Sequence, residues 1–162
     1  MPVSRVIMTC GRLCSGKSTY AQGLAEKLGA VILSVDEITL SLFPEGAGDM
    51  HDVYAERAEM YLYRKSAEIV RSGTDVILDW GFWKRSERDF ARRFYAEKHI
   101  DCELHYLDVP DAVWKQRIAE RNRRVEAGEV SAYYVDSGLA EKFAGIFEIP
   151  GDDEIDKRII IR

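Results

Sequence analysis

The chain has 162 residues, of which 46% are hydrophobic and 31% charged, and its formal net charge is −5. This length and composition predict one globular domain, residues 1–162, with its own hydrophobic core. The negative charge argues against a broad surface for long nucleic acid, although a nucleic-acid end held in a pocket stays open. The sequence shows no signal-peptide pattern, no apolar run of membrane-spanning length and no CxxC spacing among its three cysteines. We therefore expect a cytoplasmic protein with free thiols and no membrane partner.

The first predicted elements are a strand, a loop and a helix. An apolar, mostly β-branched run over residues 3–9 is typical of a short buried strand. Apolar residues at helical spacing over residues 18–28 predict a helix that Gly29 ends. The connection between them, residues 11–19, has the G-x-x-x-x-G-K-S spacing of a Walker A phosphate-binding loop.

Each residue type in this loop has a physical role in binding a nucleoside triphosphate. Gly11 and Gly16 let successive backbone N–H groups converge on phosphate oxygens, and the following helix points its positive dipole end at the same anion. Lys17 supplies a charge for the β- and γ-phosphates, and the Ser18 hydroxyl can ligate Mg²⁺. We therefore expect ATP and Mg²⁺ to bind on the loop residues Gly11, Arg12, Leu13, Cys14, Ser15, Gly16, Lys17, Ser18 and Thr19.

A second short apolar run, residues 30–35, predicts a strand that ends at Asp36. A helix over residues 36–43, with Asp36 or Ser34 as its cap, and a loop over residues 44–49 follow. A carboxylate at this place can accept the proton of an acceptor hydroxyl that attacks the γ-phosphate. The alternative is that Asp36 only caps the helix. The two roles are compatible, and we predict that Asp36 is a catalytic base.

The third predicted strand, residues 75–78, follows a long amphipathic helix over residues 52–71 and ends at Asp79. Three apolar residues before an acidic one have the form of a Walker B strand, so Asp79 can hold Mg²⁺ or contact the acceptor. Three aromatic residues follow at once: Trp80, Phe82 and Trp83. They either stack on an acceptor ring or pack a helix against the sheet, and we expect at least two of them in the core.

The C-terminal part continues the alternation, with helices over residues 86–98, 110–123 and 137–147 and strands over residues 102–107 and 158–161. The polar segment 122–136 is predicted to be a short lid. Arginines gather at its start: Arg117, Arg121, Arg123 and Arg124. Arg117 and Arg121 share a helix face, and a closing arginine segment can stabilise the migrating phosphoryl group. The alternative is a solvated basic helix end that favours the helix dipole.

Alternating strands and helices predict an α/β fold, with a parallel sheet and helices on both faces. Ligands bind such sheets outside the carboxyl ends of the strands. Gly11, Asp36, Asp79 and Asp108 all follow predicted strand ends. We therefore expect the phosphate loop and these three acids to share one cleft.

With these motifs the chain resembles the small P-loop kinases, which include adenylate- and shikimate-kinase-like enzymes. It is similar above all to the group of phage-type polynucleotide kinase domains, zeta toxins and chloramphenicol phosphotransferase. The residues that carry the resemblance are 11–19, 34–36, 76–79 and the run from Trp114 to Asn122. The resemblance implies a three-layer P-loop fold with a five-stranded parallel sheet of order 2-3-1-4-5. It also implies that Asp36 is the base, that Arg121 is the catalytic lid arginine, and that Arg117 lies nearer the adenine.

Two departures bear on the acceptor. Polynucleotide kinases of this group usually carry an arginine three residues after the aspartate, where this chain has Thr39, and no Asp-x-x-Arg of the shikimate kinase type follows Asp36. We therefore predict an ATP- and Mg²⁺-dependent kinase that phosphorylates a hydroxyl of a small-molecule acceptor.

Two alternatives stay open: a kinase of polynucleotide 5′-hydroxyl ends, and a nucleotide sensor that transfers nothing. A Ras-type GTPase would need a guanine-reading Asn-Lys-x-Asp, but Asn122, the only asparagine, is followed by Arg123. The acceptor's identity and the oligomeric state are not predicted.

Overall fold

Five parallel strands form the central sheet of the computed structural model, which describes residues 3–129 and 137–162. The strands are β1 (Arg5–Cys10), β2 (Val31–Leu33), β3 (Val76–Leu78), β4 (Asp101–Asp108) and β5 (Lys157–Ile160). Their order is β2-β3-β1-β4-β5, and the central strand places Met8 between Leu78 of β3 and Leu104 of β4. The α/β class and the strand order that the resemblance implied are therefore confirmed.

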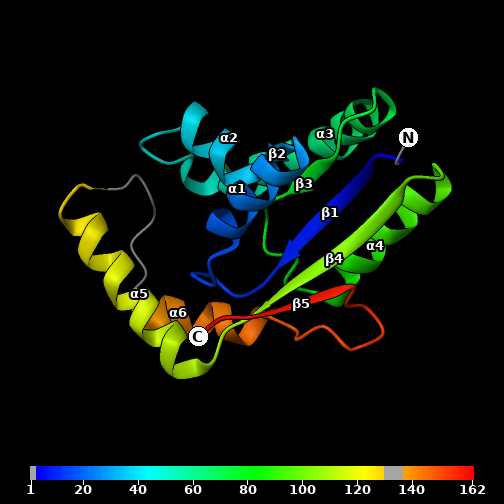
Figure 1. The fold of residues 1–162 in the computed structure, drawn as a ribbon. Helices are drawn as coiled ribbons and strands as arrows, with labels where there is room; N and C mark the ends of the chain where they lie inside the picture. Colours follow the sequence, from blue (N-terminus) through cyan, green and yellow to red (C-terminus); the bar gives the residue numbers. More distant parts are fainter. Residues whose placement is uncertain (1–2, 130–136) are drawn as a thin grey trace.

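Helices cover both faces of this sheet (Figure 1). They are α1 (Lys17–Leu28), α2 (Val35–Leu42), α3 (His51–Arg71), α4 (Arg85–Glu97), α5 (Asp111–Glu126) and α6 (Ser137–Ile146), with a short 3₁₀ turn η1 (Gly48–Met50) before α3. None of the described helices is both long enough and apolar enough to cross a membrane.

The side chains of β1 alternate between the two faces of the sheet, as the period of a strand requires. Val6 and Met8 pack in the cluster that contains Tyr63 of α3 and Tyr95 of α4. Ile7 points the other way and packs with Ala21 of α1 and with Ile77. Because both faces of β1 are buried, the run from residue 6 to residue 10 is almost continuously apolar.

Two predicted boundaries change in the structure for local reasons. The second strand ends at Leu33, because the Ser34 side chain caps α2 and accepts a hydrogen bond from the Glu37 N–H at 3.2 Å. Helix α5 runs to Glu126, past the predicted end at residue 123, and stops before Gly128 with its φ of 72°. Residues 122–126 of the predicted lid are therefore helical, and residues 130–136 of it lie outside the described residues.

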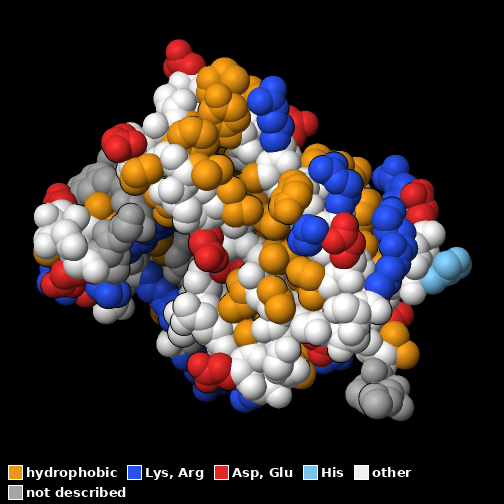
Figure 2. Space-filling model, turned by 90° about the horizontal axis from the view of Figure 1, so that it is seen from above, with side chains coloured by type: hydrophobic (Ala, Val, Ile, Leu, Met, Phe, Trp, Pro, Cys, Tyr) orange, Lys and Arg blue, Asp and Glu red, His pale blue; other side chains and the backbone are white. Residues whose placement is uncertain are grey.

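The carboxyl ends of the strands point toward α5 and α6 (Figure 1), so any site at this edge lies between the first loop and these helices. A separate apolar surface lies over α2 and α3. Figure 2 shows hydrophobic side chains gathered on the face seen from above, where α2 and α3 lie; exposed apolar residues of these two helices are Leu42, Val53, Met60 and Tyr61.

Candidate nucleotide and acceptor site

The phosphate loop is held closed by its own lysine. The Nζ of Lys17 donates hydrogen bonds to the carbonyl oxygens of Gly11 at 3.2 Å and of Arg12 at 2.8 Å. Burial lowers the pKa of Lys17 from its usual range, and the nearby carboxylate of Asp79 opposes this shift. The ammonium group therefore sits at the loop, where an incoming phosphate would replace the carbonyls as its partner.

Gly16, the residue just before α1, has a conformation that other residues rarely adopt, with a φ of 92°. A Cβ at this position would lie 2.7 Å from Nη1 of Arg117, so the missing side chain also lets the guanidinium approach the loop. Gly11 is needed for a second reason, because a Cβ there would lie 2.6 Å from the Ser15 hydroxyl oxygen.

Helix α5 lies across the phosphate loop and contacts it at several points. The indole N–H of Trp114 donates to the Leu13 carbonyl at 2.5 Å, and Nη1 of Arg121 lies 3.3 Å from Sγ of Cys14. The Arg12 guanidinium pairs with Asp111 at 2.8 Å and lies 4.4 Å over the centroid of the Trp114 ring. Arg12 is thus engaged with α5, while loop residues 13–19 line the main cavity.

The four arginines of α5 separate into two pairs. Arg121 lines the main cavity beside the loop, and Arg117 packs over Gly16 and lines a second cavity of about 570 Å³. Arg123 and Arg124 pair instead with Glu120 and Glu129 at the surface. Both Arg117 and Arg121 approach the loop, at Gly16 and at Cys14. The adenine contact of Arg117 and the catalytic role of Arg121 stay predictions.

Two oxygen donors for a metal ion lie side by side at the end of β3. The Ser18 hydroxyl donates to Oδ2 of Asp79 at 2.9 Å, and the Thr9 hydroxyl lies 3.4 Å from Oδ1 of the same carboxylate. Among the described residues no three His, Cys, Asp or Glu side chains gather as a metal site. A hydroxyl and one carboxylate fit Mg²⁺, which takes few protein oxygens and completes its shell with phosphates and water.

The main cavity has a volume of about 940 Å³ and extends from the phosphate loop to the start of α2, where Asp36 lines it. The predicted cap role falls to Ser34, so the exposed Asp36 carboxylate is not engaged as the helix cap. The expectation that Asp108 shares this cleft is wrong. Asp108 pairs with Arg158 at 3.3 Å and does not line the cavity. Asp108 is the last residue of β4 and lies opposite Ile160 of β5, where Arg158 reaches it.

The half of the cavity away from the loop is built by four helices and the aromatic turn after β3. Carboxylates line it from α2, α3 and α4, namely Asp36, Asp52, Glu59 and Glu87, while Lys142 and Phe143 come from α6. Sequence reasoning missed Glu59, Glu87 and Lys142, because each is one polar residue of an amphipathic helix and carries no signal of its own.

The three aromatic residues after Asp79 divide as expected. Phe82 is buried, and Trp80 packs against the main core cluster. Trp83 lies against Phe143, with the ring centroids 5.0 Å apart, and its indole N–H donates to the Gly11 carbonyl at 3.2 Å. All three also line the cavity, so Trp80 and Phe82 belong both to the core and to the cavity wall.

The environment of Glu59 makes the free energy of unfolding depend on pH. Burial, followed by the nearby charges of Glu87 and Glu56, raises the pKa of Glu59 from 4.5 to about 7. In the unfolded chain Glu59 loses its proton above about pH 4.5, whereas in the folded chain it keeps the proton up to about pH 7. The free energy of unfolding therefore falls between about pH 4.5 and 7 and stays lower above that.

Glu59→Gln is therefore expected to raise the free energy of unfolding by about 1–3 kcal/mol at about pH 8 and to change it little at about pH 4.5. Thermal unfolding of both proteins across this range measures the difference. Glu68→Gln, an exposed glutamate of the same helix that pairs with Lys65, is the control and is expected to give no such gain. An equal gain at both pH values would contradict the assignment.

Comparison with known proteins agrees with this geometry. A family described as "AAA domain" matches residues 6–141. The curated protein "Uncharacterized protein Rv2004c" from Mycobacterium tuberculosis (strain ATCC 25618 / H37Rv) is 31% identical over 105 residues. The match covers 59% of this chain and 21% of the relative, so the chain spans about a fifth of the length of the curated relatives it matches.

Two solved structures show the same fold. The Mycobacterium tuberculosis APS kinase CysC, solved in complex with AMPPNP and APS, has a TM-score of 0.70 at 19% identity, covering 99% of this chain and 90% of that one. A gluconokinase from Sinorhizobium meliloti 1021 has a TM-score of 0.63 at 17% identity, covering 99% and 84%. At these identities the likeness establishes the fold.

Proposed function

This chain belongs to the AAA domain family, and from that premise we propose that it is an ATP- and Mg²⁺-dependent kinase. It transfers the γ-phosphoryl group of ATP to a hydroxyl of a small-molecule acceptor. The observation that carries the proposal is that the phosphate loop and Asp36 open into one cavity of about 940 Å³. A sensor that only binds nucleotide needs the phosphate half of this cavity but not the half that Asp36 lines.

The residues divide the reaction between them. The backbone N–H groups of the loop bind the phosphates, and Lys17 and Arg121 stabilise the charge on the transferring group. Ser18 and Asp79 would hold Mg²⁺, which when bound neutralises charge on the β- and γ-phosphates. Asp36 accepts the acceptor's proton while the acceptor oxygen forms its bond to the γ-phosphorus, the bond from that phosphorus to the bridging oxygen breaks, and ADP leaves.

The charge of the acceptor half supports a small neutral or cationic acceptor over a polynucleotide end. Besides Asp36, three carboxylates line this half, against one lysine, Lys142. A polyanionic strand would meet like charges there, whereas hydroxyls of a small molecule can donate hydrogen bonds to carboxylates. The aromatic rings of Trp80 and Trp83 add an apolar wall of the kind common in small-molecule sites.

The proposal is tested by γ-phosphate transfer from labelled ATP with Mg²⁺ to a panel of nucleosides, sugars, antibiotics and 5′-hydroxyl oligonucleotides. We expect a labelled product with a small hydroxyl-bearing acceptor and none with the oligonucleotides at low salt. Transfer to an oligonucleotide end alone would favour the polynucleotide kinase. ATP binding without transfer to any acceptor would count against the proposal and favour the sensor.

A further inference from the structure

Outside the cavity, a buried arginine on α4 is tied to the turn that grips the phosphate loop. We propose that Arg88 is a positioning residue of the nucleotide site, acting through the turn of residues 79–83 on Gly11. The inference rests on the proposed function only in that the loop binds nucleotide phosphates. It concerns a residue that does not line the cavity and touches no substrate.

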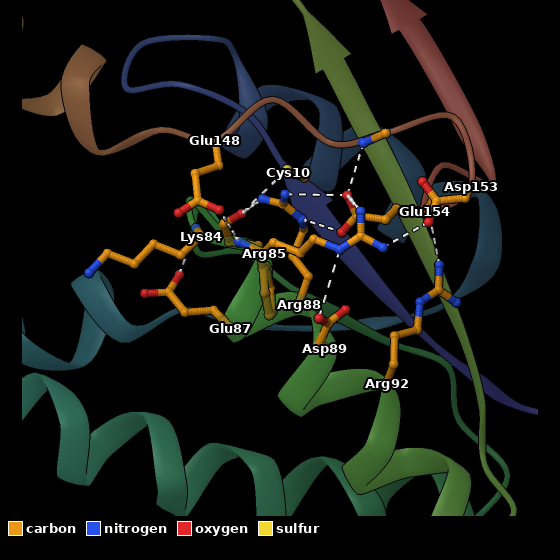
Figure 3. Close-up of polar contacts among 12 residues, drawn as sticks. Cys10, Lys84, Arg85, Glu87, Arg88, Asp89, Arg92, Glu148, Asp153 and Glu154 are labelled. Carbon is orange, nitrogen blue, oxygen red and sulfur yellow. Dashed lines mark hydrogen bonds and ion pairs between the residues drawn. The ribbon is translucent and has the colours of Figure 1, made fainter.

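Arg88 is engaged on both sides of its guanidinium. Only 2% of the residue is exposed, and its Nε donates to Oε1 of Glu154 at 2.8 Å (Figure 3). Its Nη1 donates to the carbonyl of Phe82 at 2.7 Å. The second oxygen of Glu154 accepts a hydrogen bond from the Gly151 N–H at 2.9 Å. A buried ion pair is costly unless its partners are hydrogen-bonded, and here Glu154 also accepts from Gly151 while Arg88 also donates to Phe82.

The carbonyl that Arg88 binds belongs to a residue in an unfavourable conformation. Phe82 has a φ of 48°, a left-handed conformation that is strained for a residue other than glycine. Its side chain is buried in the core, and its carbonyl is also 3.5 Å from Sγ of Cys10. Such a conformation persists only where surrounding contacts hold it, and Arg88 supplies the charged one.

The residues on either side of Phe82 grip the first residue of the phosphate loop. The Gly11 N–H donates to the carbonyl of Gly81 at 3.2 Å, and the Gly11 carbonyl accepts from the Trp83 indole at 3.2 Å. The same carbonyl accepts a hydrogen bond from Lys17 Nζ at 3.2 Å. Loss of the Arg88 contact would free the Phe82 peptide to turn, which moves both partners of Gly11 and with them the anchor of Lys17.

Arg92, one turn later on α4, offers a matched comparison. Its guanidinium also ties α4 to the C-terminal segment, through Asp156 at 2.6 Å, the Glu154 carbonyl at 2.8 Å and the carbonyl of Cys102. None of these partners belongs to the turn of residues 79–83. Removing either arginine removes cross-links of α4, but only Arg88 donates a hydrogen bond to the turn itself, whereas Arg92 reaches only the main chain of Glu154 behind it.

The test measures the Kd of ATP with Mg²⁺ by calorimetry, together with Tm, for the full chain and for Arg88→Met and Arg92→Met. All proteins are titrated at one temperature well below the lowest Tm among them, so that each is fully folded and lost stability does not enter the comparison. We expect Arg88→Met to weaken binding roughly 10- to 100-fold, the scale of a displaced binding group, and Arg92→Met to change it less than about 3-fold. Arg88→Lys, which keeps the charge but not the two-sided geometry, is expected to lie between them and serves if Arg88→Met does not fold.

A double-mutant cycle with Trp83→Phe asks whether Arg88 acts through the turn. The phenylalanine keeps a ring beside Phe143 but removes the N–H that binds Gly11. If Arg88 acts through this contact, adding Trp83→Phe to the Arg88 variant weakens binding by less than the product of the single effects. Equal changes of Kd in the Arg88 and Arg92 variants would overturn the inference, and so would additive effects in the cycle. As long as the wild-type chain binds ATP, neither result affects the proposed function. A wild-type chain that binds no nucleotide would overturn both.

Discussion

Lys17→Met is expected to lower phosphoryl transfer by about 10³-fold or more, because the charge facing the β- and γ-phosphates is lost while the side chain keeps a similar length. In the structure the Lys17 ammonium group is held at the loop by hydrogen bonds to the carbonyls of Gly11 and Arg12. Methionine would leave this position without a charge. The measurement is kcat with the acceptor found in the panel, together with the Kd of ATP.

The control for this prediction is Lys27→Met, an exposed lysine at the other end of the same helix. It changes the net charge by the same amount and is expected to keep full activity. A Lys17 variant with normal turnover would show that the loop does not bind the phosphates in the way its sequence predicts.

Asp36→Asn is expected to lower kcat by about 10²- to 10⁴-fold while the Kd of ATP stays within about 2-fold. Asparagine has nearly the same shape as aspartate but cannot take up the acceptor's proton. Because Ser34 caps α2, the substitution is not expected to destabilise the helix, so an effect on kcat reports on chemistry.

Glu37→Gln is the matched control, since Glu37 is the exposed neighbour on α2 and does not line the cavity. It is expected to leave both kcat and Kd unchanged. Asp36→Asn also separates the two classes of function, because a nucleotide sensor that transfers nothing would be indifferent to it. Unchanged turnover in Asp36→Asn would remove the base from the mechanism but leave the nucleotide site intact.

The site has two halves, and the effect of a substitution depends on which half it changes. The phosphate half consists of residues 13–19, which are contiguous, together with Asp79 and α5. The acceptor half is assembled from α2, α3, α4 and α6, whose contributing side chains are far apart in the chain. Changes in the first half are expected to affect ATP binding, and changes in the second to affect the acceptor.

The sequence by itself determined those features that depend on residues close together in the chain. The spacing of Gly11, Gly16, Lys17 and Ser18 predicts a phosphate loop because one short stretch of backbone makes the whole binding surface. The alternation of apolar strands and amphipathic helices predicts the parallel sheet, and the sheet order agrees with the resemblance. Asp36 and Asp79 were placed at the site from their positions at strand ends, and both line the cavity.

Only the tertiary structure decided which side chains meet across the chain. Asp108 also follows a strand end, but the sheet order places it beside β5 and Arg158. Trp114 reaches Leu13, Trp83 reaches Gly11, and Arg88 pairs with Glu154. Such contacts join residues that are distant in sequence and depend on the packing of whole helices against the sheet. No local pattern encodes them, because a buried arginine or an indole N–H acquires its partner only when the chain has folded.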